Sequence, residues 1–118
     1  DIVVASLDWT LSGGAETLIL TGAARSGTGD EGRNVITGTA SDDSLSGMGG
    51  ADVLRGGLGA DRLEGGAEID RLEGGDGDDR LIGGAGADRL WGGDGADAFI
   101  FDAVPPAGQP DRIRDYDQ

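Results

Sequence analysis

Acidic side chains at a fixed spacing are the residues of this chain best suited to do chemistry. An Asp followed two positions later by a large apolar residue recurs every nine residues, seven times in succession. These aspartates are Asp43, Asp52, Asp61, Asp70, Asp79, Asp88 and Asp97, and Asn34 holds the same phase one step earlier. Carboxylates and main-chain carbonyls are the ligands that Ca²⁺ prefers. Paired carboxylates also serve as acid and base in glycoside cleavage, so the spacing allows two kinds of chemistry.

Catalysis has little support in the rest of the composition. The chain contains no His, no Cys and no Lys, and Arg supplies all nine basic residues. General bases and nucleophiles are therefore limited to carboxylates, Ser, Thr and Tyr116, and nothing marks one Ser as activated. Zinc, copper and haem sites lack their usual imidazole and thiolate ligands. We expect a module with no catalytic activity of its own, although its parent protein can still be an enzyme.

The net charge of −14 excludes some classes of binding partner. The length of 118 residues allows one ordinary domain at most. An acidic surface repels nucleic acid, which is itself a polyanion. No apolar run approaches the roughly 18 residues of a membrane span, and no secretory leader pattern is present, so we expect no transmembrane segment. Without Cys, a disulfide framework is impossible and the compartment cannot be read from cysteine pairing.

Glycine is the second repeating residue, and it separates this chain from a disordered acidic tail. Its 25 positions and the high charge are a composition that usually indicates disorder. A Gly nevertheless lies five positions before each repeating residue, at Gly29, Gly38, Gly47, Gly56, Gly65, Gly74, Gly83 and Gly92. A disordered tail has no reason to keep one phase for so long, so the repeat favours an ordered array.

The repeating units carry a family resemblance. They read GGLGADRLE from Gly56, GGAEIDRLE from Gly65, GGDGDDRLI from Gly74, GGAGADRLW from Gly83 and GGDGADAFI from Gly92. They resemble the calcium-binding nonapeptide G-G-x-G-x-D-x-U-x of the RTX (hemolysin-type) family, and four of the five match every fixed position. The earlier units, GTASDDSLS from Gly38 and GMGGADVLR from Gly47, match less well.

The resemblance divides the chain into three regions. Residues 29–100 are the calcium-binding nonapeptide repeats, and residues 1–28, with SLDWTL and AETLILTG, resemble the strand-rich lead-in of such a roll. Residues 101–118 are expected to be a truncated C-terminal capping segment, because the tail from Ala98, with AFIFD and then PDRIRDYD, resembles the sequence that follows the last repeat in secreted RTX proteins. Both ends look cut from a longer protein, because the first residues have the Asp-x-apolar shape of an earlier repeat.

The family fold is an all-β, right-handed parallel β-roll, or β-solenoid, in which two nonapeptides make one coil. A unit such as Arg62-Leu63-Glu64 alternates out, in, out, and predicts a three-residue strand. The six residues from Gly56 to Asp61 predict a turn in which glycines allow positive φ. The side chains expected to point inward are Ile36, Leu45, Leu54, Leu63, Leu72, Leu81, Leu90 and Phe99. This core is small for the chain, so metal binding must supply part of the folding free energy.

In this fold each loop stacks on the loop two units away, and the resemblance implies one Ca²⁺ between each stacked pair. One edge carries the loops that begin at Gly38, Gly56, Gly74 and Gly92, and the opposite edge those that begin at Gly29, Gly47, Gly65 and Gly83. Three intervals on each edge allow six ions, each held by an aspartate from both loops and by glycine carbonyls. Beside the seven aspartates, the expected ligands are Gly50, Gly57, Gly59, Gly74, Gly75, Gly77, Gly83, Gly84, Gly86, Gly93 and Gly95.

The two edges are expected to bind calcium unequally. One of them has Glu68 where the pattern has Gly, and Asn34 where it has Asp. If the fourth loop position is left-handed, a residue such as Glu68 costs about 1–2 kcal/mol there. Two alternatives stay open, in which Glu68 adopts an ordinary turn or its carboxylate becomes a replacement ligand.

Outward side chains allow a second function. Arg62, Arg71, Arg80 and Arg89 could form an anion-binding stripe for uronate polysaccharides. A solvated face on which Arg neutralises neighbouring acids such as Glu64 and Glu73 is favoured. An ice-binding roll would need a flat row of Thr, and only Thr37 and Thr39 come near one.

The aromatic residues have simpler interpretations as packing. Trp91 could be a platform for sugar stacking, but we expect it to pack beneath the C-terminal segment, with Phe101, Ile113 or Tyr116. Trp9 lies in the lead-in and is expected to be part of the core.

The resemblance implies a module of a larger secreted bacterial protein that leaves the cell by type I export. Such a module is unfolded at low cytosolic calcium and folds on binding extracellular Ca²⁺, which aids secretion, folding and the stability of flanking domains. The alternative is a polysaccharide-binding module of an extracellular carbohydrate-active enzyme, like those attached to alginate epimerases, working through the Arg face and Trp91.

Overall fold

The computed structural model describes residues 2–12, 14 and 16–100, and the backbone of residues 112–115. Within these residues the secondary structure consists of strands joined by turns, which confirms the all-β class. The strands are β1 (Ile2–Ala5), β2 (Trp9–Thr10), β3 (Thr17–Leu20), β4 (Ser26–Thr28), β5 (Val35–Thr37), β6 (Ser44–Ser46), β7 (Val53–Gly57), β8 (Arg62–Gly66), β9 (Arg71–Gly75), β10 (Arg80–Gly84), β11 (Arg89–Trp91), β12 (Ala98–Ile100) and β13 (Arg112–Asp115). No helix capable of spanning a bilayer occurs in the described residues.

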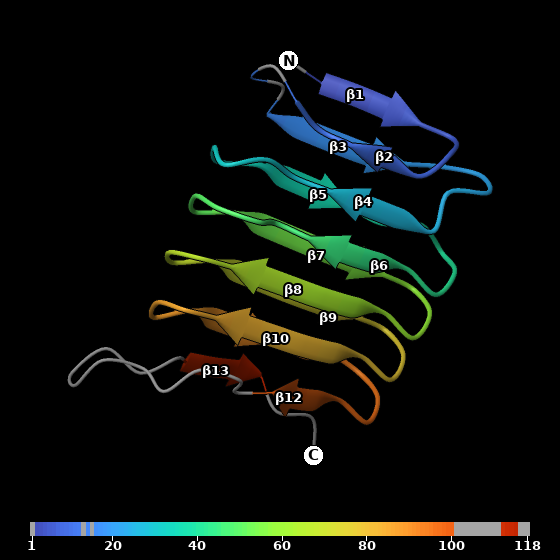
Figure 1. The fold of residues 1–118 in the computed structure, drawn as a ribbon. Coiled ribbons are helices and arrows are strands. Elements are labelled where there is room, and N and C mark those ends of the chain that lie inside the picture. The colour runs from blue at the N-terminus through green and yellow to red at the C-terminus, as the bar shows by residue number, and fades with distance from the viewer. Residues whose placement is uncertain (1, 13, 15, 101–111, 116–118) are drawn as a thin grey trace.

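The strands alternate between two parallel sheets that face each other (Figure 1). The odd sheet runs in the order β1-β3-β5-β7-β9-β11-β13, and the even sheet in the order β2-β4-β6-β8-β10-β12. Each strand pairs with the strand two places along the chain, so the chain passes through both sheets in turn and advances by one strand per coil. This architecture is a β-solenoid, as the family resemblance implies.

The register of the sheets places equivalent repeat positions on top of one another. Leu54 lies opposite Leu72 in the odd sheet, and Leu63 lies opposite Leu81 in the even sheet, in each case 18 residues further along. Because side chains alternate across a strand, one column of each sheet points inward in every coil. Two nonapeptides therefore make one coil, as predicted.

The core between the sheets consists of these inward columns. The predicted inward side chains from Ile36 to Leu90 are each at most 1% exposed, and Phe99 is partly buried against them. The first coils add further apolar side chains to the same cluster, namely Ala5, Leu11, Leu18, Leu20 and Ala24.

The strands in the middle of the array are longer than the three residues predicted. β7 to β10 each contain five residues, and the last two of each are glycines. These glycines extend the ladder, since Gly57 pairs with Gly75 and Gly66 pairs with Gly84. Glycine has no side chain, so it contributes nothing to the alternation of polar and apolar positions from which a strand is predicted. The predicted strand is therefore shorter than the observed one. The predicted turn ligands Gly74, Gly75, Gly83 and Gly84 lie in strands.

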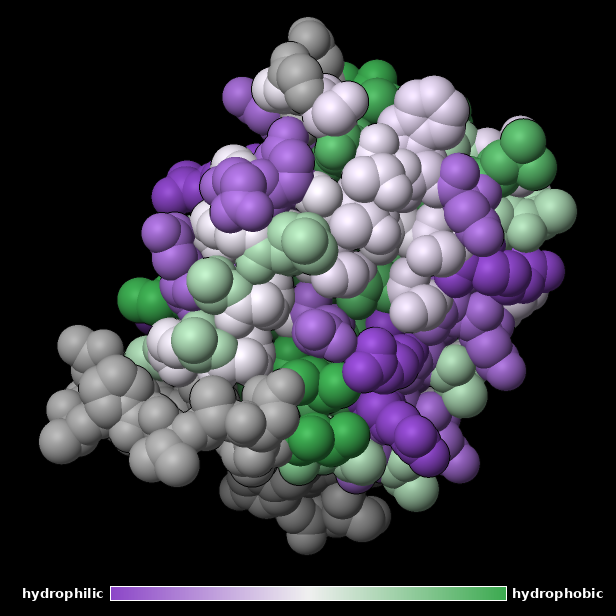
Figure 2. All heavy atoms as spheres, in the orientation of Figure 1, coloured by the Kyte–Doolittle hydropathy of each residue, from purple (hydrophilic) through white to green (hydrophobic). Residues whose placement is uncertain are grey.

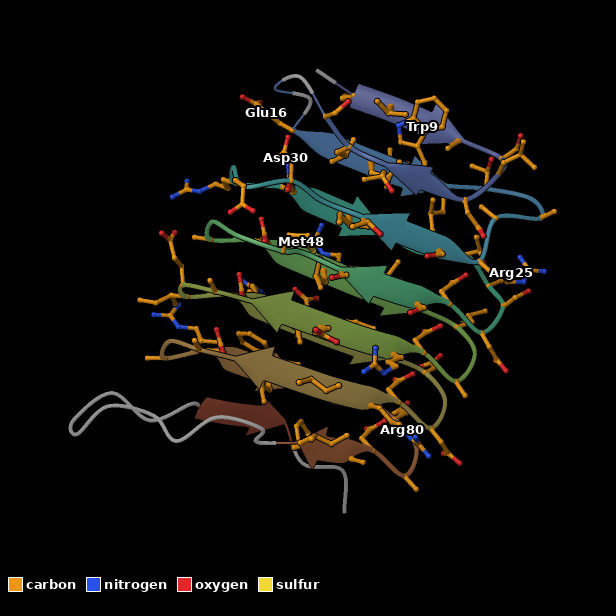
Figure 3. All side chains as sticks on the ribbon, viewed as in Figure 1. Trp9, Glu16, Arg25, Asp30, Met48 and Arg80 are labelled. Carbon is orange, nitrogen blue, oxygen red and sulfur yellow. The ribbon has the colours of Figure 1, made fainter. Side chains whose placement is uncertain are left out.

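The first coil continues the same two sheets, but it is shorter. Ile2 pairs with Thr17, 15 residues away, whereas Thr17 pairs with Val35, 18 residues away. The expectation that Trp9 belongs to the core is wrong, because 49% of this residue is exposed. Trp9 pairs with the inward-facing Gly27, but β2 is the edge strand at the N-terminal end of the even sheet, and no other strand of the described residues pairs with its free side (Figure 3).

At the other end, β13 adds to the odd sheet beside β11, with Ile113 in register with Leu90. The C-terminal segment therefore extends this sheet beyond the last repeat. The predicted partners Phe101 and Tyr116 lie outside the described residues.

The outer face of the even sheet changes character along the roll. Its outward residues are Ser26, Thr28, Ser44 and Ser46 on β4 and β6, followed by Arg62, Glu64 and Arg80 on β8 and β10. In Figure 2 the upper part of this face is pale, and strongly polar and apolar side chains appear below it. The charged residues therefore gather on the later coils.

Candidate metal sites at the two loop edges

The loops between the sheets form two stacks, one at each edge of the roll. The repeat loops that follow strands of the odd sheet stack at the right edge in Figure 1, and the first of them is residues 38–43. The repeat loops that follow strands of the even sheet stack at the left edge, and the first of them is residues 29–34. Neighbouring loops within a stack are one coil apart. The predicted assignment of loops to edges is therefore that of the structure.

The repeating aspartates form a buried column in each stack. Asp52, Asp61, Asp70 and Asp79 are each at most 2% exposed. Within a column, the Oδ1 atom of one aspartate accepts a hydrogen bond from the main-chain N–H of the equivalent residue one coil earlier. The bond from Asp43 to Asp61 is 2.8 Å long, as is the bond from Asp61 to Asp79. These hydrogen bonds give the aspartates a structural role, joining one coil to the next, which their spacing in the sequence did not predict.

The second carboxylate oxygen has a different environment. The Oδ2 atoms of Asp52, Asp61, Asp70 and Asp79 are buried and accept no hydrogen bond. Burial raises the pKa of Asp52, Asp61 and Asp79 to about 7 and that of Asp70 to about 8, against an ordinary value of 3.8. The N–H bond to Oδ1 lowers each pKa, and neighbouring carboxylates raise it further. A buried carboxylate with a bare oxygen is costly to ionise unless a cation lies beside it.

The first glycine of each loop leaves room for this oxygen. A Cβ on Gly56 would collide with Asp61 Oδ2 and would lie 2.6 Å from the carbonyl oxygen of Gly74, one coil further on. A Cβ on Gly65 would likewise collide with Asp70 Oδ2 and lie 2.8 Å from the carbonyl oxygen of Gly83. The structure therefore brings a predicted aspartate ligand and a predicted carbonyl ligand to the same small space between loops.

The other predicted glycine ligands share one backbone conformation. All of them have positive φ, namely Gly50, Gly57, Gly59, Gly75, Gly77, Gly84, Gly86, Gly93 and Gly95. Two residues that are not glycine adopt it as well, Met48 with φ 76° and Glu68 with φ 72°. The expectation that the fourth position is left-handed at Glu68 is confirmed. The strain at Met48 was missed, although its unit reads GMGG where later units begin with GG.

The donor set suits a hard cation that accepts main-chain oxygens. Among the described residues, no group of three or more carboxylates gathers into a metal site. Except beside Asn34, the intervals between loops instead offer aspartates from two coils together with glycine carbonyls. These are oxygen ligands of the kind that Ca²⁺ accepts in flexible geometry. The bare Oδ2 atoms and the space above the glycines fit such an ion.

Charged pairs occupy the outer faces, away from the loop edges. Arg71 Nε contacts Glu73 Oε2 at 2.8 Å, and the Arg71 guanidinium lies 4.4 Å from the centre of the Trp91 ring. Arg55 also approaches Glu73, at 3.6 Å. On the even sheet, Arg62 Nη1 lies 3.2 Å from an oxygen of Glu64. These contacts agree with the expected neutralisation of acids by outward Arg side chains.

Comparison with known proteins agrees with this geometry. The RTX calcium-binding nonapeptide repeat (4 copies) matches residues 28–63 and again residues 64–99, which together exceed half of the chain. Comparisons with curated proteins and with solved structures give no significant match. The matched residues contain both loop stacks and all seven repeating aspartates of the two columns. The chain belongs to the RTX family of calcium-binding nonapeptide repeats.

Proposed function

We propose that this chain is a calcium-binding β-roll module that folds when Ca²⁺ enters the intervals between its stacked loops. The observation that supports this most directly is the row of buried Oδ2 atoms without a hydrogen-bond donor, at Asp52, Asp61, Asp70 and Asp79. Without a cation, nothing in the folded roll compensates the charge that these buried oxygens carry when the carboxyl groups ionise. A bound divalent ion supplies the missing positive charge.

The ligands in this proposal are the glycine carbonyls of the loops and the aspartates whose buried Oδ2 atoms accept no hydrogen bond, Asp52, Asp61, Asp70 and Asp79. The aspartates contribute Oδ2, while Oδ1 remains with the N–H ladder. The glycine conformations keep the loops narrow, so that main-chain oxygens of adjacent coils approach the same space. Asp88 and Asp97 hold the equivalent positions in the last two loops, and their Oδ1 atoms accept the N–H groups of Asp70 and Asp79.

The biological role follows from where calcium is abundant. Free Ca²⁺ is scarce in the cytosol and millimolar outside the cell, so a metal-dependent roll stays unfolded before export and folds after it. RTX repeats are typically extracellular, and type I export is the route that the family resemblance implies. The folded roll would then stabilise the exported protein and support its flanking domains.

The first prediction is a calcium-triggered folding transition. In excess chelator, the far-UV circular dichroism spectrum of the chain should be that of a largely disordered polypeptide, and millimolar Ca²⁺ should convert it to a β-rich spectrum. Mg²⁺ is the matched control, and it should substitute poorly because it demands a smaller octahedral shell and keeps its waters. A complete β signal in excess chelator would show that the fold does not depend on the metal.

Polysaccharide binding is the competing function, but the four Arg side chains expected to form its stripe are divided between the sheets. Arg62 and Arg80 lie on the even sheet, and Arg71 and Arg89 lie on the odd sheet, which also carries Trp91. The outer face of the odd sheet carries Arg55, Arg71 and Trp91, but both Arg side chains already contact Glu73, and Arg71 covers one face of the indole ring. A uronate chain would have to displace these contacts. A glycan-binding screen on the calcium-loaded chain discriminates the two functions, and we expect no uronate binding.

A further inference from the structure

Two of the eight loops differ from the other six in their backbone. In the six loops from residues 47–52 to residues 92–97, the second and fourth positions both have positive φ, even where they are Met48 and Glu68. In the loops of residues 29–34 and 38–43, neither position does. We refer to these two as the closed loops and to the other six as the open loops.

The closed loops share a hydrogen bond that occupies the sixth side chain. The N–H of Thr39, at the second position, donates to Asp43 Oδ2 at 2.6 Å, and the Thr39 hydroxyl lies 3.0 Å from the same oxygen. In the other closed loop, the N–H of Asp30 donates to Asn34 Oδ1 at 2.8 Å (Asp30 is labelled in Figure 3). The sixth side chain of a closed loop is therefore held by its own loop.

A second bond, also common to both, keeps the closed loops in this shape. The side chain at the second position accepts the N–H of the fourth residue, from Ser41 to Thr39 Oγ1 at 3.0 Å and from Gly32 to Asp30 Oδ1 at 2.8 Å. Glycine, which holds the second position in five open loops, has no side chain to make this bond. The residue at the second position thus decides which kind of loop forms.

The occupied oxygen at Asp43 is equivalent to the bare oxygen of the open loops. Asp61, one coil further on in the same stack, has a buried Oδ2 that accepts no hydrogen bond. A cation beside Asp43 Oδ2 would face the Thr39 N–H, whose hydrogen carries partial positive charge, and that bond would have to break first. The closed loop therefore holds a donor where the open loop has room for a metal ion.

We propose that the closed loops bind no calcium and that calcium occupies only the intervals between two open loops. This inference rests on the proposed calcium-binding function and narrows it. Among the described residues it reduces the six expected ions to four. The intervals lie between residues 47–52 and 65–70, 65–70 and 83–88, 56–61 and 74–79, and 74–79 and 92–97. The closed loops then form a metal-free start to both stacks.

The residue at the sixth position supports this division. One closed loop has Asn34 instead of Asp, and its amide oxygen accepts the Asp30 N–H just as a carboxylate oxygen accepts that of Thr39 in the other. A metal site would lose a charged ligand through this exchange, whereas a hydrogen-bonded loop needs only an acceptor. The chain itself thus contains one closed loop with Asn and one with Asp at the sixth position.

Asp43→Asn and Asp61→Asn form a matched pair of variants, one coil apart in the same stack. In the first, the amide oxygen can accept the Thr39 N–H; in the second, it can keep the ladder bond from Asp43 while an NH₂ group replaces Oδ2. We expect native mass spectrometry of the full chain to count as many calcium ions on Asp43→Asn as on the natural chain. Asp61→Asn should bind one ion fewer, or need at least about tenfold more calcium for half-folding.

Loss of an ion from Asp43→Asn, equal to the loss from Asp61→Asn, would overturn the inference. A second measurement needs no substitution: amide hydrogen exchange of Thr39 and Asp30 in the calcium-loaded natural chain should be slow, and exchange at the rate of a free amide would also overturn it. If the natural chain binds no calcium at all, the proposed function fails instead, so the two failures are distinguishable.

Discussion

Each repeating aspartate divides two tasks between its two carboxylate oxygens. Asp79 Oδ1 accepts the N–H of Asp61 at 2.8 Å, while Asp79 Oδ2 is buried without a donor. The first oxygen joins one coil to the previous one, and the second is available to a metal ion. Asparagine preserves the first task and removes the second, whereas alanine removes both.

This division predicts a graded response at Asp79, whose loop borders two intervals between open loops. Asp79→Asn should raise the calcium concentration needed for half-folding steeply, and Asp79→Ala should raise it further. The additional cost in Asp79→Ala is about 1–3 kcal/mol, because the buried Asp61 N–H loses its acceptor. Calcium titrations followed by circular dichroism measure both midpoints, and equal midpoints would contradict the separation of tasks.

The raised pKa values predict how the calcium-free chain responds to acid. Asp52, Asp61, Asp70 and Asp79 have pKa values of about 7 to 8 in the folded roll, well above the ordinary 3.8, so the folded state binds protons more tightly than the unfolded chain. Their protonated forms favour folding below about pH 4, and this contribution is lost as pH rises through 7 to 8.

In chelator, β structure should therefore increase as pH falls from about 8 to about 4. With calcium present, a fall in pH should instead weaken folding, because protons compete with the metal for Oδ2. The calcium concentration needed for half-folding should therefore rise below about pH 7. Circular dichroism at a series of pH values measures both trends. A calcium-free chain that loses structure on acidification over this range would contradict the burial of ionisable oxygens.

Glu68 is the residue whose replacement should strengthen calcium binding. Its φ of 72° is unfavourable for a side chain by about 1–2 kcal/mol, and Glu68→Gly relieves this cost in a loop that borders two intervals. The variant should therefore need less calcium for half-folding. Glu68→Gln is the control, because it removes the charge and keeps the strained backbone. Weaker calcium binding by both variants than by the natural chain would indicate that the carboxylate is a ligand.

At the scale of strands and loops, the repeat predicted the inward columns, because buried Leu and Ile keep a strict phase. The two edges and the offset of one coil were predicted from the family resemblance. The repeat did not predict that Gly74 and Gly75 extend β9, since residues without side chains carry no alternation. The exposure of Trp9 was also unforeseen, because burial at the end of a roll depends on whether another coil follows. The hydrogen-bond ladder from Asp N–H groups to Asp Oδ1 atoms was not predicted either, because it joins residues 18 positions apart that only the fold brings side by side.

The glycine pairs at the strand ends predict a sharp steric limit within the ladder. Gly75 has φ 95°, and a Cβ there would collide with the carbonyl oxygen of Gly57 in the neighbouring strand. Gly14 has φ 86° with nothing within 4 Å of the same position. Gly14→Ala therefore carries only the backbone cost, about 1 kcal/mol, whereas Gly75→Ala also separates β7 from β9. Thermal unfolding in saturating calcium should show the larger loss for Gly75→Ala; equal losses would contradict the close approach.

At the scale of the whole molecule, the net charge of −14 opposes compaction until cations are bound. Four divalent ions would cancel eight of these charges. The folded roll has a radius of gyration of 13.1 Å, the size expected of a compact chain of this length. An unfolded chain of the same length has a radius of about 35 Å.

Small-angle scattering should therefore report a large change in size with calcium. We expect a radius of gyration near 13.1 Å in millimolar Ca²⁺ and a much larger value in chelator. Added monovalent salt at high concentration is the control, because it screens charge without filling the intervals between loops. Compaction by salt alone to the calcium-loaded size would show that general screening, and not a bound ion, drives the transition.

The pairing of each coil with the next also fixes the sequence separation between neighbouring strands of a sheet. From β3 to β12, the paired residues are 18 positions apart, as in Thr17 with Val35 and Arg80 with Ala98. Strands that pair over so short a stretch of chain do not need its distant end before they begin to assemble. A chain that emerges gradually from a narrow pore could thus wind up one coil at a time, in the order in which its residues arrive.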